Sequence, residues 1–156
     1  MKFYDSVKTA SGYTLYIVFD DEKVYEITSQ IPDGTPSAVA EKYKYIKDYL
    51  SGHCCQPMLI EAFDDLDMSW ATPFMRKVYK ALSLIPCGTT VSYGYLAELA
   101  GRPKAARAVG SAMAKNRFLI VIPCHRVLAS GHRIGGFSSG LDMKRALLRC
   151  EGHNEF

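Results

Sequence analysis

Apolar and polar residues alternate in short stretches near the start of the chain. Residues 3–8 and 13–20 carry apolar side chains at every second position, and a third short run, 24–27, follows acidic turn residues. A period of two is typical of strands that bury one face. Because the connections are short, the pattern predicts three strands in an antiparallel meander.

A helical period then replaces this alternation. Apolar residues at 39, 43, 46 and 50 follow Thr35-Pro36, which favours a helix start, and precede Gly52, which favours its end. Residues 57–63 predict a further extended segment. The acidic run 64–67 is the best candidate boundary, so we expect an N-terminal domain over 1–67 and a C-terminal domain over 68–156.

Four stretches in the second half have helical spacing. Thr72-Pro73 repeats the start signal, Ser92 can cap a second helix, and Gly101 ends it. We expect helices over residues 73–85, 93–100, 103–114 and 141–150. The middle two, joined by a short turn with a glycine, have the spacing of a helix-turn-helix unit.

The predicted fold class is mixed: α/β in the broad sense and α+β in detail. We expect a small N-terminal antiparallel sheet with one helix packed on it, ribonuclease H-like in type. The C-terminal domain should be helical, with a winged-helix-like helix-turn-helix. No run approaches the roughly 20 apolar residues of a membrane span. The five cysteines, an odd number without an export signal, predict a cytoplasmic protein that lacks a disulfide framework.

Charge divides the chain unequally. Residues 1–68 carry a net charge of −6 and residues 69–156 a net charge of +9. A basic half can bind a polyanion, although a solvated basic face would look the same. The predicted helix over 103–114 offers small residues and the two cations Lys104 and Arg107. Small side chains allow close approach in the minor groove of DNA; packing against a neighbouring helix is the equally weighted alternative.

The candidate chemistry lies around Cys124. The apolar run 119–122 predicts a buried strand that Pro123 ends, followed at once by Cys124, His125 and Arg126. A thiol reacts as the thiolate, which an adjacent imidazole or positive charge favours. The alternative is an inert buried cysteine.

The loop 135–140 and the run 53–55 are two further candidates for ligand binding. The loop 135–140, with three glycines and two serines, can form the wall of a pocket for a polar planar ligand. His53-Cys54-Cys55 has the wrong spacing for tetrahedral zinc, because adjacent cysteines cannot easily both bind one ion. We therefore expect no metal and no cofactor.

Several motifs of the second half together resemble the O6-alkylguanine-DNA alkyltransferases. The most specific pair is Pro-Cys-His-Arg at 123–126 with Ala-Ala-Arg-Ala-Val-Gly at 105–110. The other matching motifs are Ile-Pro-Cys-Gly at 85–88, Val-Ser-Tyr-Gly at 91–94 and Glu-Gly-His at 151–153. The first half matches this family only in its pattern of three strands and a helix.

The resemblance implies a reaction and a partner. Cys124 would accept the alkyl group from guanine O6, His125 would take the thiol proton through a water, and Glu151 would orient His125. Tyr93 would lend a proton toward guanine N3, and Arg107 would fill the gap left by the flipped base. The partner would be double-stranded DNA containing O6-alkylguanine, bound by a monomer with no membrane association. Because a thioether is not hydrolysed, one molecule would act once.

The resemblance also implies supporting residues. Those expected to bind DNA are Arg107, Ala105, Ala106, Lys104, Arg102 and Ser92. Those expected at the substrate pocket are Ser138, Phe137, Met113, Lys144 and Pro123. Asn116 and Arg126 are expected to couple the active site to the surrounding structure.

Two other classes of function were compared with this one. A cysteine hydrolase or phosphatase would need an oxyanion hole or an anion-binding loop, and a helix-turn-helix would serve it no purpose. A non-catalytic DNA-binding regulator, or a sensor of alkylated bases, would need no cysteine in the Pro-x-His-Arg element. Cys124 is present, so the sequence favours the enzyme.

Overall fold

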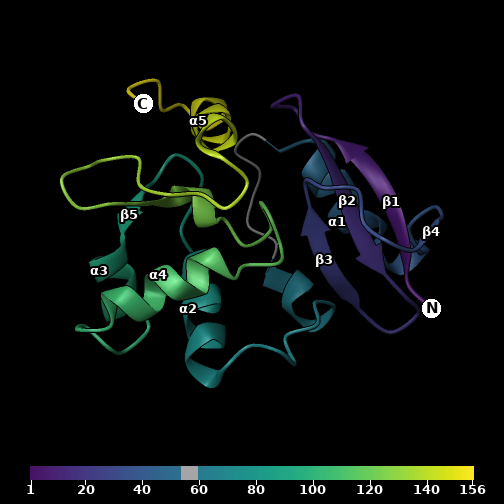
Figure 1. Cartoon of the computed structure of the whole chain (residues 1–156), viewed down its shortest axis with the longest axis horizontal. Helices are drawn as coiled ribbons and strands as arrows, with labels where there is room; N and C mark the ends of the chain where they lie inside the picture. Colours follow the sequence, from purple (N-terminus) through teal and green to yellow (C-terminus); the bar gives the residue numbers. More distant parts are fainter. Residues whose placement is uncertain (54–59) are drawn as a thin grey trace.

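The computed structural model describes residues 1–53 and 60–156, and Figure 1 shows a sheet beside a group of helices. The sheet contains the three predicted strands, β1 (Phe3–Lys8), β2 (Thr14–Phe19) and β3 (Val24–Thr28), paired antiparallel in sequence order. Leu15 and Ile17 of β2 are fully buried, as the alternation predicts. The mixed α+β fold class is confirmed.

A fourth strand replaces the predicted helix start. Thr35 and Pro36 form β4 (Thr35–Pro36), which runs parallel to β1 at the edge of the sheet. Thr35 therefore caps no helix, and this prediction was wrong; an edge strand tolerates proline because one side of it needs no donor. The helix begins later, as a 3-10 turn, η1 (Glu41–Tyr43), followed by α1 (Lys44–Ser51).

The segment between the two predicted domains is attached to the sheet. Residues 57–59 of the expected extended segment 57–63 lie outside the described residues. Residues 60–63 belong to a 3-10 helix, η2 (Ile60–Asp64), so the prediction of an extended segment was wrong for them. Val24 N donates to Asp65 O at 2.8 Å, and Asp67 N donates to Val24 O at 2.8 Å. The acidic run is thus paired with β3, and the domain division stays a prediction.

The helices of the second half begin where their caps predict, with one exception. The helices are α2 (Pro73–Ser83), α3 (Tyr93–Leu99), α4 (Ala106–Ala114) and α5 (Leu141–Cys150). Thr72 and Ser92 accept backbone N–H groups at the starts of α2 and α3. Helix α4 starts three residues after the predicted Pro103, because residues 103–104 form a turn closed by Ala105 N donating to Arg102 O at 3.0 Å.

The run 119–122 is buried, but it is not the predicted strand. Ile120 has a φ of 70°, and Ile122 N donates back to Phe118 O at 3.0 Å. The run therefore turns tightly on itself beside the end of β3, where Leu119 N donates to Ile27 O at 3.1 Å. A short apolar run predicts burial, whereas its backbone conformation depends on its neighbours.

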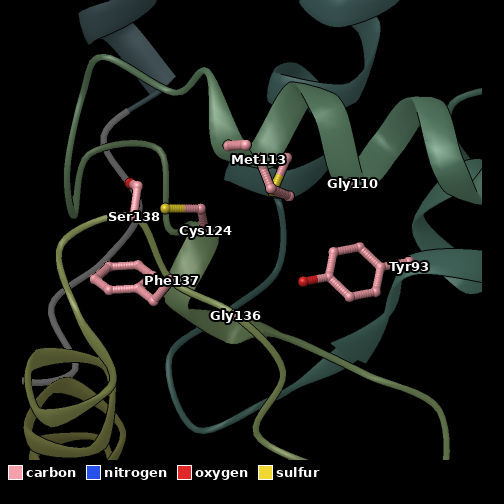
Figure 2. A pocket seen from close by; sticks show the side chains of 8 residues that line it. Tyr93, Gly110, Met113, Cys124, Gly136, Phe137 and Ser138 are labelled. Carbon is pink, nitrogen blue, oxygen red and sulfur yellow. The ribbon is translucent and has the colours of Figure 1, made fainter.

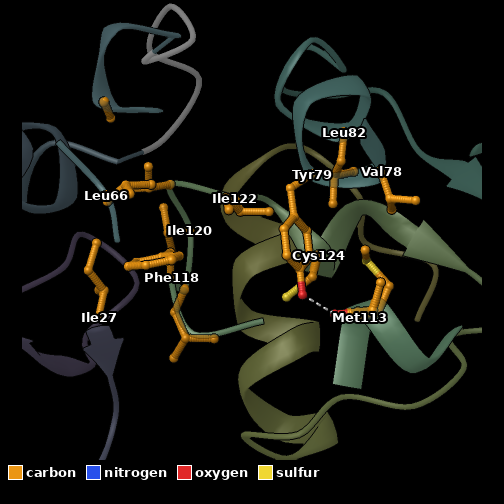
Figure 3. Close-up of a cluster of buried hydrophobic side chains, with 14 of the residues drawn as sticks. Ile27, Leu66, Val78, Tyr79, Leu82, Met113, Phe118, Ile120, Ile122 and Cys124 are labelled. Atoms are coloured by element: carbon orange, nitrogen blue, oxygen red, sulfur yellow. Dashed lines mark hydrogen bonds between the residues drawn. The ribbon is translucent and has the colours of Figure 1, made fainter. Parts of the chain in front are cut away.

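One hydrophobic core extends from the sheet to the helices. Figure 3 shows Ile27, Leu66 and Phe118 on the sheet side, and Tyr79 with Cys124 on the helix side. The Tyr79 hydroxyl is buried and donates to a backbone oxygen of α4 at 2.6 Å. Among the described helices, none is long and apolar enough to cross a membrane.

Candidate active site and DNA-facing helices

A pair of two-residue strands brings the cysteine segment beside the helix-turn-helix. Pro123 is followed by a 3-10 helix, η3 (Cys124–Arg126), and then by β6 (Val127–Leu128), which pairs parallel with β5 (Val91–Ser92). Strand β5 leads directly into α3, whose first residue is Tyr93. The pairing therefore brings Tyr93 and Cys124 to the same cavity, although 31 positions separate them in the chain.

This cavity has a volume of about 180 Å³. Its walls come from four places: the start of α3, the second half of α4, the first residue of η3 and the glycine-rich loop before α5. The lining residues are Tyr93, Gly110, Met113, Ala114, Cys124, Gly136, Phe137 and Ser138. Figure 2 shows the sulfur of Cys124 beside Ser138, with the Tyr93 hydroxyl directed toward the same space. Cys124 is the free cysteine among the described residues, and its side chain is buried.

Three of the five predicted pocket residues line the cavity, namely Ser138, Phe137 and Met113. Lys144 instead lies beneath the loop, where its Nζ donates to Val127 O at 2.7 Å and to Gly136 O at 3.1 Å. Burial lowers the pKa of Lys144 to about 8. Pro123 is buried ahead of η3 and does not line the cavity.

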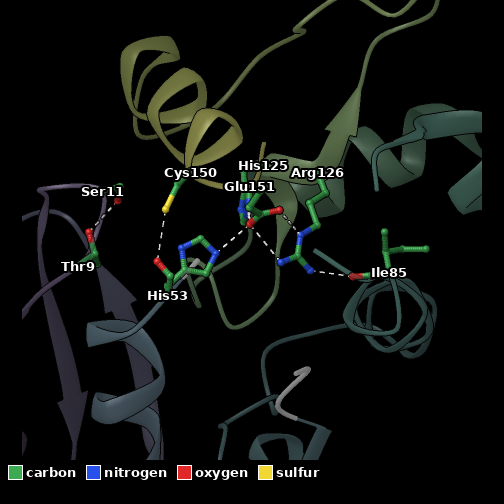
Figure 4. A network of polar contacts seen from close by, with 8 residues as sticks. All are labelled: Thr9, Ser11, His53, Ile85, His125, Arg126, Cys150 and Glu151. Carbon is green, nitrogen blue, oxygen red and sulfur yellow. Dashed lines mark hydrogen bonds and ion pairs between the residues drawn. The ribbon is translucent and has the colours of Figure 1, made fainter. Parts of the chain in front are cut away.

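Glu151 is the centre of a buried polar cluster behind Cys124 (Figure 4). Its Oε2 accepts hydrogen bonds from His125 Nε2 at 2.6 Å and from His53 Nε2 at 2.8 Å. Arg126 donates from Nε to Oε1 at 2.7 Å, from Nη2 to Oε2 at 3.1 Å, and from Nη1 to Ile85 O at 2.7 Å. We call His53, His125, Arg126 and Glu151 the Glu151 cluster; each is at most 4% exposed.

The surroundings set the protonation states of these groups. Burial raises the pKa of the Cys124 thiol, so the thiol holds its proton at neutral pH. Burial lowers the pKa of His125, which is therefore neutral and able to accept a proton. Burial alone would raise the pKa of Glu151, but hydrogen bonds from His125 and His53 outweigh it and hold that pKa well below its usual value. A protonated thiol thus lies next in sequence to a neutral imidazole that is paired with a carboxylate.

Asn116 connects the end of α4 to the cysteine segment. Its Nδ2 donates to Ile122 O at 3.0 Å, and its Oδ1 accepts from Phe118 N at 2.9 Å. Both contacts hold the tight turn that precedes Pro123. The Asn116 side chain also favours the Cys124 thiolate, although burial has the larger effect and raises the thiol pKa.

The residues predicted to bind DNA gather around α3 and α4. Arg107, Lys104, Arg102 and Ser92 are exposed, and Ala105 and Ala106 are half-buried. The Arg102 guanidinium lies over the Phe74 ring, 4.9 Å from its centroid. Met113 and Gly110 of α4 line the cavity while Arg107 of the same helix is exposed, so one helix borders both the cavity and the basic surface.

His53 was missed as a site residue. The sequence offers it only as a metal ligand beside Cys54 and Cys55, which lie outside the described residues. The ligand atoms of His53, His125 and Glu151 lie within 4.8 Å of one another, the spacing of a possible metal site. Glu151 Oε2 already accepts three N–H groups, however, and the Arg126 charge lies against the same carboxylate. These donors fit a hydrogen-bonded cluster better than a divalent cation.

The cysteines differ from expectation in one respect. Cys87 and Cys150 are each disulfide-bonded, so the expected absence of disulfides was wrong for these two residues. An odd number of cysteines does not reveal which sulfur atoms a fold brings together.

The fold and the cavity define a class: an α+β protein whose helix-turn-helix borders a cavity that contains a free cysteine backed by a histidine–glutamate pair. The sequence model of the 6-O-methylguanine DNA methyltransferase DNA binding domain matches residues 73–153. The chain belongs to this methyltransferase family.

Relatives and a solved structure agree with this assignment. A methylated-DNA–protein-cysteine methyltransferase of Mycobacterium bovis is 39% identical over 132 residues, which cover 83% of this chain and 75% of the relative. One from Shigella flexneri is 40% identical over 119 residues, 76% of this chain, and the match spans 64% of that relative's length. The crystal structure of Mycobacterium tuberculosis OGT in complex with DNA has a TM-score of 0.74 and 32% identity, covering 96% of this chain and 92% of that one.

Proposed function

We propose that this chain repairs DNA by moving the alkyl group of O6-alkylguanine to Cys124. The observation that carries the proposal is the free Cys124 thiol at a cavity, backed by a neutral histidine that is paired with Glu151. The cavity of about 180 Å³ is smaller than the roughly 300–1,000 Å³ of sites for drug-sized ligands. That size suits one flipped base better than a larger ligand.

The reaction would be a direct displacement at the alkyl carbon. The Cys124 thiol loses its proton to His125 through a water, and the sulfur then attacks the carbon attached to O6. The S–C bond forms as the C–O6 bond breaks, and the electron pair of that bond leaves with the guanine. Burial raises the pKa of Tyr93, so its hydroxyl is protonated at neutral pH and can donate toward the leaving base. No cofactor takes part in these steps.

The product determines how often the protein acts. A thioether to a saturated carbon has no carbonyl for water to attack, unlike the acyl group of a cysteine hydrolase. The thiol is therefore not regenerated, and each molecule would act once.

Duplex DNA is the proposed partner. Arg107, Lys104 and Arg102 are exposed on α4 and the turn before it, and the second half of α4 lines a cavity that a base inside a duplex cannot enter. The base would have to leave the helix, with Arg107 filling the gap. The related M. tuberculosis OGT was solved in complex with DNA, which supports this partner. A monomeric state and a cytoplasmic location stay predictions.

The alternative is a non-catalytic sensor of alkylated bases. It would share the helix-turn-helix and the cavity but would not need a nucleophile. The free thiol at the cavity, with its paired histidine, favours the enzyme.

Intact mass spectrometry tests the proposal. Incubation with duplex DNA containing O6-methylguanine should add one methyl group per molecule, on the peptide that contains Cys124. Cys124→Ala should bind the DNA and gain no mass. Binding without mass gain in the wild type would indicate the sensor, and repeated turnover would contradict the single-use mechanism.

A further inference from the structure

His53 reaches the active-site cluster from outside the segment that defines the family, residues 73–153. It follows Gly52, the residue that ends α1, and is fully buried. Its ring stands edge-on to the His125 ring, with centroids 5.7 Å apart and planes at 85°. In Figure 4 its ring points toward Glu151, and His53 lies below Cys150 of α5. The His53 carbonyl oxygen lies 3.4 Å from the sulfur of Cys150.

The shared acceptor defines the tautomer of both histidines. A carboxylate only accepts hydrogen bonds, so both Nε2 atoms that contact Glu151 Oε2 carry a proton. The Nδ1 atoms of His53 and His125 are buried and have no hydrogen-bond partner within residues 1–53 and 60–156. An imidazolium would place a second buried N–H without an acceptor, which costs free energy. Both rings therefore fit the neutral Nε2–H form, which leaves Nδ1 of His125 free to accept a proton.

We propose that His53 is a positioning residue for alkyl transfer, which holds the His125 ring and shares the Glu151 oxygen that supports it. The proposal rests on the function proposed for Cys124. His53 does not touch the substrate cavity; it acts through His125 and Glu151.

Because His53 and His125 share Glu151 Oε2, the carboxylate stabilises a positive charge on His125 less than it would without His53. Each N–H donor at Oε2 stabilises part of the carboxylate charge. Without the His53 donor, more of that charge acts on His125, and the imidazolium formed when His125 takes the thiol proton becomes more stable. His125 then keeps a proton to higher pH, so its neutral form, which takes the thiol proton, becomes available only at higher pH. Among the described residues, the other titratable or charged groups around His53 are Arg126 beside Glu151, and Tyr49 of α1, whose ring centroid lies 6.5 Å from that of His53.

The pH dependence of the single-turnover rate tests this role. His53→Phe keeps a ring of similar size but has no donor, whereas His53→Gln keeps an N–H. With O6-methylguanine duplex as substrate, we expect the rise of rate with pH to move about one pH unit toward alkaline pH in His53→Phe. His53→Gln should return it to the wild-type position. His132→Phe, at an exposed histidine outside the Glu151 cluster, is the matched control.

The results for His53 and the result for alkyl transfer by the wild type can be told apart. An unchanged midpoint in His53→Phe, whatever the maximal rate, would overturn the role of His53. If that variant does not fold, nitrogen NMR of the wild-type imidazoles decides: Nε2–H tautomers for both rings support the proposal, and an Nδ1–H or doubly protonated His53 at neutral pH overturns it. If the wild type transfers no methyl group, the proposed function fails, and the NMR result still describes the cluster.

Discussion

Arg126 and Arg107 show how differently one residue type is used in two regions of the molecule. Arg126 is 2% exposed and donates three hydrogen bonds, two of them to Glu151. Arg107 is exposed on α4, and its side chain forms no hydrogen bond or ion pair with residues 1–53 and 60–156. Arg126 therefore helps to hold the Glu151 cluster together behind Cys124, whereas Arg107 is available to an external partner.

This contrast is sharpest in unfolding experiments. Arg126→Met should lower the free energy of unfolding by about 3–5 kcal/mol, because it leaves the Glu151 carboxylate buried without its cation. Arg107→Met, the matched control, should change it by less than about 0.5 kcal/mol. Urea unfolding measures both values, and equal losses would remove the distinction.

The pH dependence of stability tests the same region. The pKa of Glu151 is lower in the folded protein than in the unfolded chain, so its contribution is present above the unfolded pKa and is lost as pH falls toward the folded pKa. Below about pH 4, the stability advantage of the wild type over Glu151→Gln should shrink by up to about 1.4 kcal/mol per pH unit. A difference that does not depend on pH would show that Glu151 is not held as a carboxylate.

The exposed arginine should affect repair and leave stability unchanged. Arg107→Ala should slow methyl transfer from duplex DNA by roughly tenfold or more, a loss of at least about 1.4 kcal/mol. Reaction with a free O6-alkylguanine base, which needs no flipping, should keep its rate. Equal losses on duplex and free base would show that Arg107 only supports the fold.

Two helix caps give the smallest effect. Thr72→Ala and Ser92→Ala each remove a side-chain acceptor at a helix start and should each cost about 1 kcal/mol in urea unfolding. Ser92 also lies on the predicted DNA-facing side, so Ser92→Ala alone should weaken binding to duplex DNA. If the two variants bind DNA with equal affinity, Ser92 only caps α3 and does not contact DNA.

Local signals predicted much of the fold. The alternation over 3–28 predicted the antiparallel meander, and the caps at Thr72 and Ser92 predicted where α2 and α3 begin. The prediction at Thr35-Pro36 was wrong because the same two residues also suit an edge strand, and the neighbouring β1 decided between the two.

The sequence by itself predicted which group would react. Cys124, His125 and Arg126 are adjacent, and the burial of the apolar run before them follows from its composition. A nucleophile with a histidine beside it, ahead of a glycine-rich loop, could be predicted because each of these signals lies within a few residues.

Only the tertiary structure decided what surrounds that group. Glu151 follows the last helix, where a lone glutamate is usually exposed to solvent, and yet it is buried against His125 and Arg126 from η3. His53 reaches the same oxygen from 98 positions away. A carboxylate is stable in a protein interior only when several donors converge on it, and such convergence depends on how distant segments pack.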